Sequence, residues 1–367
     1  MIDAERLART FVELCRIPSP SGHEGAVAAY VRAQLEALGL RVEEDNAGAA
    51  LGSDVGNLIV HTSGRGEPFF LTAHMDTVPP TPVDGHVPVI VEGDRVHTGG
   101  RSILGGDDKA GVAVALEMLR LAAEQPFRPL DVVFTVQEEL GARGAAHLAG
   151  ERLCAQQGFV LDGDTPVGVA IRRSPHKVRY YLTVTGRAAH AALNPEDGIN
   201  AIAAIGAVAA ALPTGKLDAL SVANIGRIEG GGAINVVPER AELIGELRSH
   251  ERATLEAHQA RIEAVAHERA AAYGARADLR WEQLYPGYDV PEDAPIARLF
   301  TRACAAEGVQ AAFEVTYGGG DANPLNGKER ACVVFGLGMQ AIHSPQEYIL
   351  LSDLTRAARI LRQALTS

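Results

Sequence analysis

PFFLTAHMDTV, residues 68–78, is the stretch of this sequence that says most about the fold. An uncharged apolar run leads directly into His74 and Asp76, which is the pattern of a buried strand that ends in polar side chains. Similar apolar runs at NLIVH (57–61) and DVVFTV (131–136) predict further buried strands, and helical patterns lie between the runs. Strands and helices that alternate along the chain predict the α/β class.

A different pattern begins near residue 174. In KVRYYLTVTG (177–186), apolar and polar side chains alternate, which predicts a strand with one face in water. A helix, two strands, a long helix that ends at Gly274 and a last strand, ARADLRWEQLY (275–285), are predicted after it. The first of these helices (about 198–212) is expected to be built on Ile199, Ile202, Ile205 and Val208, and the two strands are expected at about 221–229 and 239–249.

The resulting order, βαββαβ, predicts a ferredoxin-like α+β unit that is inserted into the chain. After this unit the sequence returns to strand and helix patterns, which we expect to complete the first sheet. The prediction is one α/β domain in two parts, 1–173 and 287–367, with 174–286 inserted between them. A chain of 367 residues fits this division, because a single hydrophobic core stops growing at about 250 to 300 residues.

The composition limits the partners of the chain. With 46 acidic and 34 basic residues the net charge is −12, which argues against nucleic acid or an anionic membrane and favours a small molecule or a peptide. The N-terminus lacks the apolar core of a secretion signal and no apolar stretch is of membrane-spanning length, so we expect a cytoplasmic protein. The four cysteines lack CxxC spacing, which predicts free thiols.

His74 and Asp76 suit a metal site, because an imidazole at the end of a strand can bind a cation while a neighbouring carboxylate orients the ring. A buried pair that is only hydrogen-bonded is the alternative. A glycine-rich turn that opens a helix predicted from Asp108 to Glu124 adds Asp107 and Asp108. For these two carboxylates, capping of the helix N-terminus is the alternative role.

Three more motifs add carboxylates and an imidazole. DVVFTVQEEL ends in Glu138 and Glu139, of which one could bind a metal while the other faces the water, with a surface charge pair as the alternative. Asp162 follows a short apolar run, and His343 lies in a loop where simple exposure is the alternative. The carboxyl ends of strands in an open α/β sheet meet at one crevice, so these side chains are expected to converge there. The expected group is His74, Asp107, Glu139, Asp162 and His343.

The order of the motifs resembles a known family. HMDTV, GGDDKAG, QEELG, LDGD, GRAAHA and HSPQEY resemble the M20 metallopeptidases over nearly the whole chain, and GGGDANPLNGK with HSPQEYI is most similar to the peptidase T branch. The resemblance implies an α/β, zinc-exopeptidase-like catalytic domain and makes the inserted unit a lid and dimerisation domain. It also implies an aminopeptidase that hydrolyses short peptides, with a preference for tripeptides. A deacylase or carboxypeptidase for N-acyl amino acids and a non-catalytic peptide-binding relative are the alternatives.

The resemblance also implies a metal-ligand set. Asp107 would bridge two divalent ions, with His74 and Asp162 completing one site and Glu139 and His343 the other. Carboxylate and imidazole ligands without a thiolate favour Zn²⁺, with Mn²⁺ or Co²⁺ as alternatives.

Three further expectations concern the neighbours of these ligands. Asp76 would steady His74, and Glu138 would be the general base that acts on a water held between the two ions. The peptide that joins Asp107 to Asp108 is expected to be cis. The family usually has Ala before the bridging aspartate, where this chain has Gly106.

The inserted unit also contains a part that resembles the family. The similarity of GRAAHAALNPEDGINAI to the family's lid signature implies that His190 reaches across a dimer interface to polarise the scissile carbonyl. Asn235 and Arg248 match positions that hold the substrate, although a surface ion pair is the alternative for Arg248. Gly319, in the run 318–321, would let the backbone approach a ligand, with a plain turn as the alternative. The resemblance therefore implies a homodimer joined through the lid domains.

Overall fold

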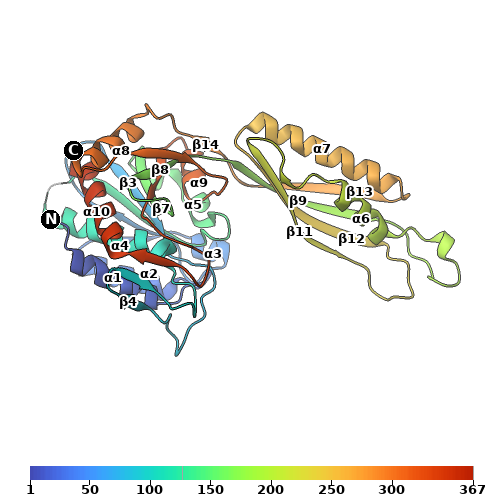
Figure 1. Cartoon of the computed structure of the whole chain (residues 1–367), viewed down its shortest axis with the longest axis horizontal. Helices are drawn as coiled ribbons and strands as arrows, with labels where there is room; N and C mark the ends of the chain where they lie inside the picture. The colour runs from blue at the N-terminus through green and yellow to red at the C-terminus, as the bar shows by residue number, and fades with distance from the viewer. Residues whose placement is uncertain (126, 367) are drawn as a thin grey trace. The chain divides into compact units, whose positions relative to one another are not determined.

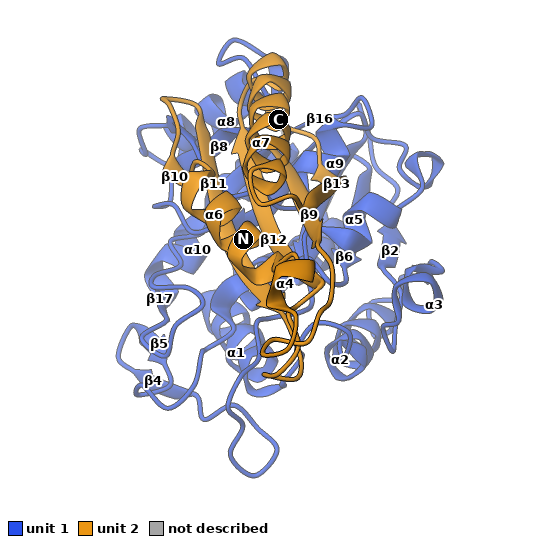
Figure 2. Cartoon of the chain, turned by 90° about the vertical axis from the view of Figure 1, so that its right-hand side faces the viewer, with its two compact units in different colours: residues 1–174, 289–367 blue, residues 175–288 orange. Residues whose placement is uncertain are grey.

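The chain consists of two compact units (Figure 2). The computed structural model describes residues 1–125 and 127–366, so the predicted C-terminal limit at Ser367 lies outside the described residues. Unit 1 comprises Met1–Ser174 and Asp289–Ser367, and unit 2 comprises Pro175–Tyr288. Among the described residues, no helix has the length and apolar character needed to cross a membrane.

A nine-stranded mixed sheet forms the centre of unit 1. Its strand order is β1-β2-β6-β3-β7-β16-β8-β14, and β15 pairs with β8. The four strands β6, β3, β7 and β16 run parallel, so their carboxyl ends lie at the same edge of the sheet. The strands are β1 (Val42–Glu44), β2 (Leu58–His61), β3 (Phe69–His74), β6 (Leu130–Thr135), β7 (Gln157–Gly163), β8 (Val169–Ser174), β14 (Tyr288–Asp289), β15 (Ala312–Val315) and β16 (Ala331–Gly336).

Helices cover this sheet. The central one, α4, packs on β3 and β7 and is also in contact with α1 and α10 (Figure 1). Its side chains are almost all buried, as expected of a mainly apolar helix that is enclosed by other elements. The helices are α1 (Ala4–Arg16), α2 (Gly25–Glu36), α3 (Ala47–Leu51), α4 (Gly106–Glu124), α5 (Arg143–His147), α8 (Pro295–Ala306), α9 (Ala322–Asn326) and α10 (Leu351–Thr366). A small sheet of β4 (Ile90–Glu92), β5 (Arg95–His97) and β17 (Tyr348–Leu350) completes the unit.

The start of α4 differs from the prediction. The helix was expected from Asp108 and begins at Gly106, but Asp107 (ψ 103°) and Asp108 (ψ 38°) have non-helical backbone angles. Regular helix therefore starts at Lys109. The expected cis peptide between Asp107 and Asp108 is confirmed.

Unit 2 is an antiparallel sheet with two helices on one face. The sheet order is β10-β11-β12-β9-β13, which is the expected βαββαβ topology with one added strand of two residues, β10. The α/β class with an inserted ferredoxin-like unit is thus confirmed. The elements are β9 (His176–Thr185), α6 (Ala201–Ala211), β10 (Gly215–Lys216), β11 (Ser221–Gly230), β12 (Arg240–Ser249), α7 (Arg252–Ala271) and β13 (Arg276–Tyr285).

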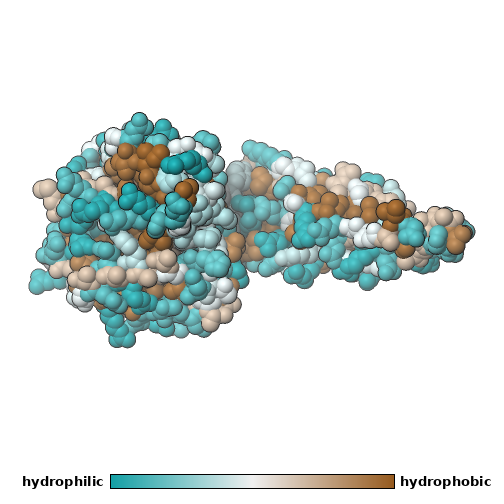
Figure 3. Space-filling model, turned by 90° about the horizontal axis from the view of Figure 1, so that it is seen from below, coloured by the Kyte–Doolittle hydropathy of each residue, from teal (hydrophilic) through white to brown (hydrophobic). Residues whose placement is uncertain are grey.

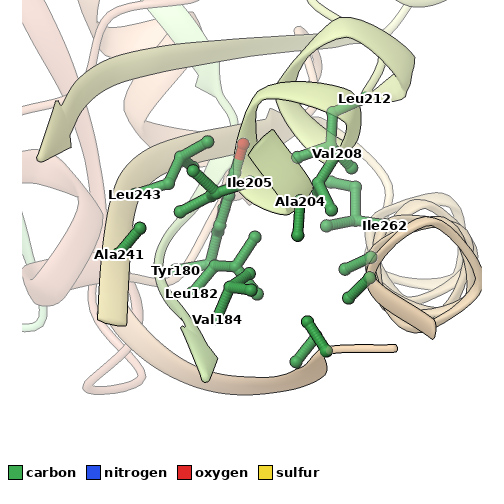
Figure 4. Close-up of a cluster of buried hydrophobic side chains, with 14 of the residues drawn as sticks. Tyr180, Leu182, Val184, Ala204, Ile205, Val208, Leu212, Ala241, Leu243 and Ile262 are labelled. Atoms are coloured by element: carbon green, nitrogen blue, oxygen red, sulfur yellow. The ribbon is translucent and has the colours of Figure 1, made fainter. Parts of the chain in front are cut away.

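The core of unit 2 lies between the sheet and its helices. Figure 4 shows Tyr180, Leu182 and Val184 of β9 in the same cluster as side chains of α6 and Ile262 of α7. The alternation predicted for β9 is confirmed, since every second side chain is buried.

The prediction of α6 was wrong at two positions. Ile199 precedes the helix, which begins at Ala201, and Ile202 is not on the buried face. Ala201, Ala204, Ile205 and Val208 are buried, whereas Ile202 is 44% exposed. A repeat of three residues falls short of the 3.6 residues of a helical turn, so side chains spaced by three drift around the helix. The small alanines occupy the inner positions instead.

Candidate functional site

The predicted metal ligands lie at the carboxyl end of the parallel strands of unit 1. His74 is the last residue of β3, and Asp162 lies within β7 instead of following it. Glu138 and Glu139 were expected at the end of a strand, but β6 ends at Thr135 and the two glutamates lie in the turn after it. Gln137, with a φ of 52°, belongs to this turn, which allows adjacent side chains to point toward one cluster.

Two groups of side chains share Asp107. In the first group, His74 Nε2 lies 2.9 Å from Asp107 Oδ1 and 3.5 Å from Asp162 Oδ1. In the second group, His343 Nε2 lies 3.0 Å from Asp107 Oδ2 and 3.0 Å from Glu139 Oε1. In each group the ligand-type atoms lie within 4.8 Å of one another. The two oxygens of one carboxylate therefore face two separate imidazoles, as a bridging ligand would.

The pKa values of the cluster show strong interactions between its charges. The neighbouring carboxylates of Asp107 and Glu139, each 3.0 Å from its ring, raise the pKa of His343 to about 10. Burial and the charge of Asp107 raise the pKa of Asp162 to about 8. Burial also raises the pKa of Glu138 well above its usual range, with a contribution from the charge of Asp162. Several carboxylates in a desolvated space repel one another, and bound cations relieve such repulsion.

The donor set fits divalent cations. Within the described part of the chain, Glu139 Oε1 is buried and has no hydrogen-bond partner of good geometry, although His343 Nε2 is 3.0 Å away. Each imidazole Nε2 faces two carboxylate oxygens, whereas a single ring nitrogen can donate only one proton. A cation placed between these atoms would satisfy all of them at once. Nitrogen and oxygen donors without sulfur suit Zn²⁺, Mn²⁺ or Co²⁺.

The carboxylate of Asp76 orders the turn that contains both glutamates. It accepts the backbone N–H of Glu138 at 2.9 Å and that of Glu139 at 3.2 Å, and the Ser21 hydroxyl donates to it at 2.6 Å. The ring of His74 lies closer to the backbone carbonyl of Asp76, at 2.9 Å, than to its carboxylate, at 3.5 Å. Asp76 thus contacts His74 as expected, but its side chain makes its shortest contacts with the glutamate turn and Ser21. These contacts could not be read from the sequence, where Ser21 has no motif that points to Asp76.

A glycine-rich turn lies beside Glu138. A Cβ atom added at Gly320 would lie 2.9 Å from Glu138 Oε1 and 3.3 Å from Asp162 Oδ2, so these two carboxylates lie close against the backbone of the turn, where a side chain would crowd them. The neighbouring Gly319 is exposed. The next residue, Asp321, is buried and accepts a hydrogen bond from the Thr135 hydroxyl.

The remaining predicted site residues belong to unit 2. His190 is exposed in a loop, and its Nδ1 accepts the backbone N–H of Ala192 and of Leu193, each at 3.1 Å. Asn235 is exposed in the loop before β12. Arg248 lies on β12, and its Nε donates to Glu246 Oε1 at 2.9 Å. These three residues are therefore in a different unit from the cluster around Asp107.

Comparison with known proteins gives consistent matches. The model of the peptidase family M20/M25/M40 matches residues 70–367. An uncharacterized protein of Bacillus subtilis, YqjE, is 33% identical over 365 residues, which cover 98% of each chain. The structure of aminopeptidase PepT from Bacillus cereus is 30% identical, with a TM-score of 0.88 over 99% of this chain and 98% of that one. A tripeptidase from Staphylococcus aureus is 31% identical, with a TM-score of 0.92 over 100% of this chain and 98% of that one.

Proposed function

Because this chain belongs to the peptidase family M20/M25/M40 and is a hydrolase of that family, we propose that it is an aminopeptidase that cleaves short peptides, including tripeptides, with two divalent cations. The observation that supports this most directly is the position of Asp107, whose two carboxylate oxygens each face a separate imidazole and carboxylate. Binding alone would not require two adjacent sites with a shared ligand, whereas amide hydrolysis uses such pairs.

Five residues would hold the cations. One cation would bind to His74, Asp107 and Asp162, and the other to Asp107, Glu139 and His343. When bound, two cations lower the pKa of a water held between them and stabilise the negative charge that forms on the amide oxygen. Zn²⁺ is the cation that this donor set favours, with Mn²⁺ or Co²⁺ able to replace it.

Glu138 would move the proton. It is buried, its backbone N–H is held by Asp76, and burial raises its pKa, so its carboxylate accepts a proton readily. After taking a proton from the attacking water, Glu138 would deliver it to the leaving amine. Gly320 has no side chain, so the carboxylate of Glu138 can lie close against the backbone there.

Residues of unit 2 would bind the substrate. Arg248 and Asn235 would hold a carboxylate or the backbone of the peptide, because a guanidinium and an amide are suited to both groups. Gly319 would contribute its backbone from unit 1. His190 would polarise the scissile carbonyl in the active site of the partner subunit, as the family's lid signature implies.

A homodimer joined through unit 2 is part of this proposal. Unit 2 has less than a third of the residues, yet among the described residues it contains six of the eleven exposed large hydrophobic side chains. Figure 3 shows hydrophobic patches in brown on its surface. These six are Leu193, Ile202, Ile228, Ile234, Val236 and Tyr273. Exposed apolar side chains that gather in patches support an association surface. The proposed location is the cytoplasm.

The test combines a metal assay with a peptide panel. Protein freed of metal should take up two equivalents of Zn²⁺ and regain activity. It should then cleave tripeptides with a free amino group, and it should fail on the same peptides after N-acetylation and on N-acyl amino acids. Cleavage of only the blocked compounds would favour the deacylase or carboxypeptidase alternative. Two bound ions without hydrolysis of any compound would contradict the enzymatic proposal.

A further inference from the structure

Glu347 is a buried carboxylate that none of the assigned roles uses. It is only 2% exposed and follows His343 by four residues. Its Oε2 accepts the backbone N–H of Leu104 at 2.7 Å and that of Gly105 at 2.9 Å. Its Oε1 accepts the backbone N–H of Asp107 at 3.1 Å. Three main-chain donors of the segment that leads to the shared aspartate thus converge on one side chain.

The other end of Glu347 is fixed in the loop that contains His343. Residues 340 and 348 close this loop through two backbone hydrogen bonds, from Gln340 N to Tyr348 O at 3.0 Å and from Tyr348 N to Gln340 O at 3.1 Å. The N–H of Glu347 donates to Ser344 O at 3.1 Å within the loop. Glu347 therefore joins the 340–348 loop to the 104–107 segment, which is about 240 residues away along the chain.

The close approach of this carboxylate also gives a reason for Gly106. A Cβ atom at this position would lie 3.1 Å from Glu347 Oε1, which is tighter than an ordinary contact. The peptidase family usually has Ala at this position, so the glycine of this chain leaves more room for the carboxylate of Glu347. The preceding Gly105 has a φ of 72°, a conformation that glycine adopts at little cost.

The ligands of the two proposed cation sites differ in how they are supported. His74 and Asp162 lie on the neighbouring parallel strands β3 and β7, whose backbone hydrogen bonds hold them. His343 lies in a loop, has a φ of 59° and is about half exposed. Its position relative to Asp107 depends on contacts between the 340–348 loop and the 104–107 segment, and Glu347 supplies three of these contacts.

We infer that Glu347 is a positioning residue that sets the geometry of the cation site formed by Asp107, Glu139 and His343. This inference rests on the proposed two-cation function. Glu347 contacts no reacting group and acts through the backbone of Asp107 and through the loop of His343. Loss of the Glu347 carboxylate should lower the affinity for the cation at this site more than the affinity for the cation bound by His74 and Asp162. Residues that orient metal ligands typically change metal affinity by about 10- to 100-fold.

The experiment is a calorimetric titration of metal-free protein with Zn²⁺, on the wild type and on Glu347→Gln. Glutamine keeps the size of the side chain but places an NH₂ group against one set of backbone N–H donors. The wild type should bind two ions. Glu347→Gln should bind one ion with nearly unchanged affinity and the other about 10- to 100-fold more weakly.

The matched control is Asp131→Asn, which changes another buried carboxylate that accepts a backbone N–H, from Ala155 at 2.8 Å. Asp131 lies at the start of β6, away from the carboxyl end of the sheet, and both ions should bind this variant normally. Gly106→Ala crowds Glu347 without removing any hydrogen-bonding group. It should weaken the binding of the same ion that Glu347→Gln affects, but by a smaller factor. It serves as the test variant if Glu347→Gln does not fold, as judged by circular dichroism of the metal-free protein.

Normal binding of both ions by a folded Glu347→Gln, or by Gly106→Ala where that variant replaces it, would overturn the inference. An equal loss of affinity for both ions would also overturn it, since a general loss of structure would then explain the effect. Failure of the wild type to bind two ions would instead refute the proposed function on which the inference rests.

Discussion

Glu138 and Glu139 are adjacent, yet their environments suit them to different tasks. Glu139 Oε1 lies 3.0 Å from His343 Nε2, whereas Glu138 lies against Gly320 and belongs to neither proposed cation group. We expect Glu138→Ala to retain both cations and to lower kcat by about 10²- to 10⁴-fold, the usual contribution of a general base. Glu139→Ala should lose one cation as well as activity. Elemental analysis and steady-state kinetics on the two variants check this, and near-normal kcat in Glu138→Ala would remove the assigned role.

Asp76 offers a second test at this scale. Asp76→Asn would place an amide where the backbone N–H groups of Glu138 and Glu139 now meet a carboxylate, so the turn should lose order. The cation at His74 should remain, because the ring also contacts the Asp76 backbone carbonyl, which the substitution retains. We expect kcat to fall by about 10- to 100-fold with one or both ions still bound. Ser21→Ala, which removes a single donor to Asp76, is the milder control. If Asp76→Asn instead loses the cation at His74 and yet has the wild-type kcat once excess metal is supplied, this division of roles is contradicted.

The side chains of the cluster around Asp107 could be predicted from the sequence, whereas the contacts that hold them in place could not. His74 and Asp162 stand at the ends of apolar runs and Asp107 stands in a glycine-rich turn before a helix, and these patterns can be recognised along the chain. Glu347 and Ser21 act through groups far away in the sequence, and no local spacing records which backbone N–H a carboxylate will meet. Such contacts depend on how the loops approach one another, which is determined only when the sheet has formed.

Among the elements, the strands of unit 2 were easier to predict than its first helix. An alternation with a period of two has no drift, so β9 could be read directly from Val178, Tyr180, Leu182 and Val184. In α6 the alanines are too small to stand out as core residues, and the larger Ile202 suggested a face that the helix does not bury. The size of a side chain is thus a weaker guide than the helical period in an alanine-rich helix.

Packing between β12 and β9 gives a stability prediction. Gly245 lies opposite Tyr180, and a Cβ atom there would be 2.2 Å from Tyr180 Cζ. Gly245→Ala should therefore lower the free energy of unfolding of unit 2 by about 1 to 3 kcal/mol through overpacking. Gly206→Ala is the control, because a Cβ at this exposed position of α6 meets nothing within 4 Å. It should stabilise the helix by about 0.5 to 1 kcal/mol.

The measurement for both variants is unfolding in urea, followed by tryptophan fluorescence. The sequence has a single tryptophan, and Trp281 lies in β13 with its ring 5.2 Å from that of Tyr180, so its signal reports on unit 2. If the urea midpoint of unfolding for Gly245→Ala is at or above that of the wild type, the ring of Tyr180 can move to make room for the added methyl group and the predicted overpacking is wrong.

For the whole molecule, the proposed assembly makes activity depend on association. If His190 of one subunit serves the active site of its partner, then His190→Ala and Glu138→Ala chains should each be nearly inactive. Mixing them should restore part of the activity, because one of the two sites in a mixed dimer regains both residues. Activity is measured after subunit exchange has been verified with differently tagged chains. Verified heterodimers that stay inactive, or a wild type that is active as a monomer, would rule out the exchange of His190 between subunits.

The pairing of β9 with β13 has a consequence for how the chain folds. Unit 2 begins at Pro175, just before β9, and ends at Tyr288, three residues after β13, and Lys177 pairs with Tyr285 near these two ends. The ends of the insertion are therefore held next to each other by the insertion itself. A flexible loop loses more entropy on closure as it becomes longer, but a folded insertion with adjacent ends acts on the surrounding sheet like a short turn. Once unit 2 has formed, β8 and the segment after residue 288 are brought together as closely as the two arms of a hairpin.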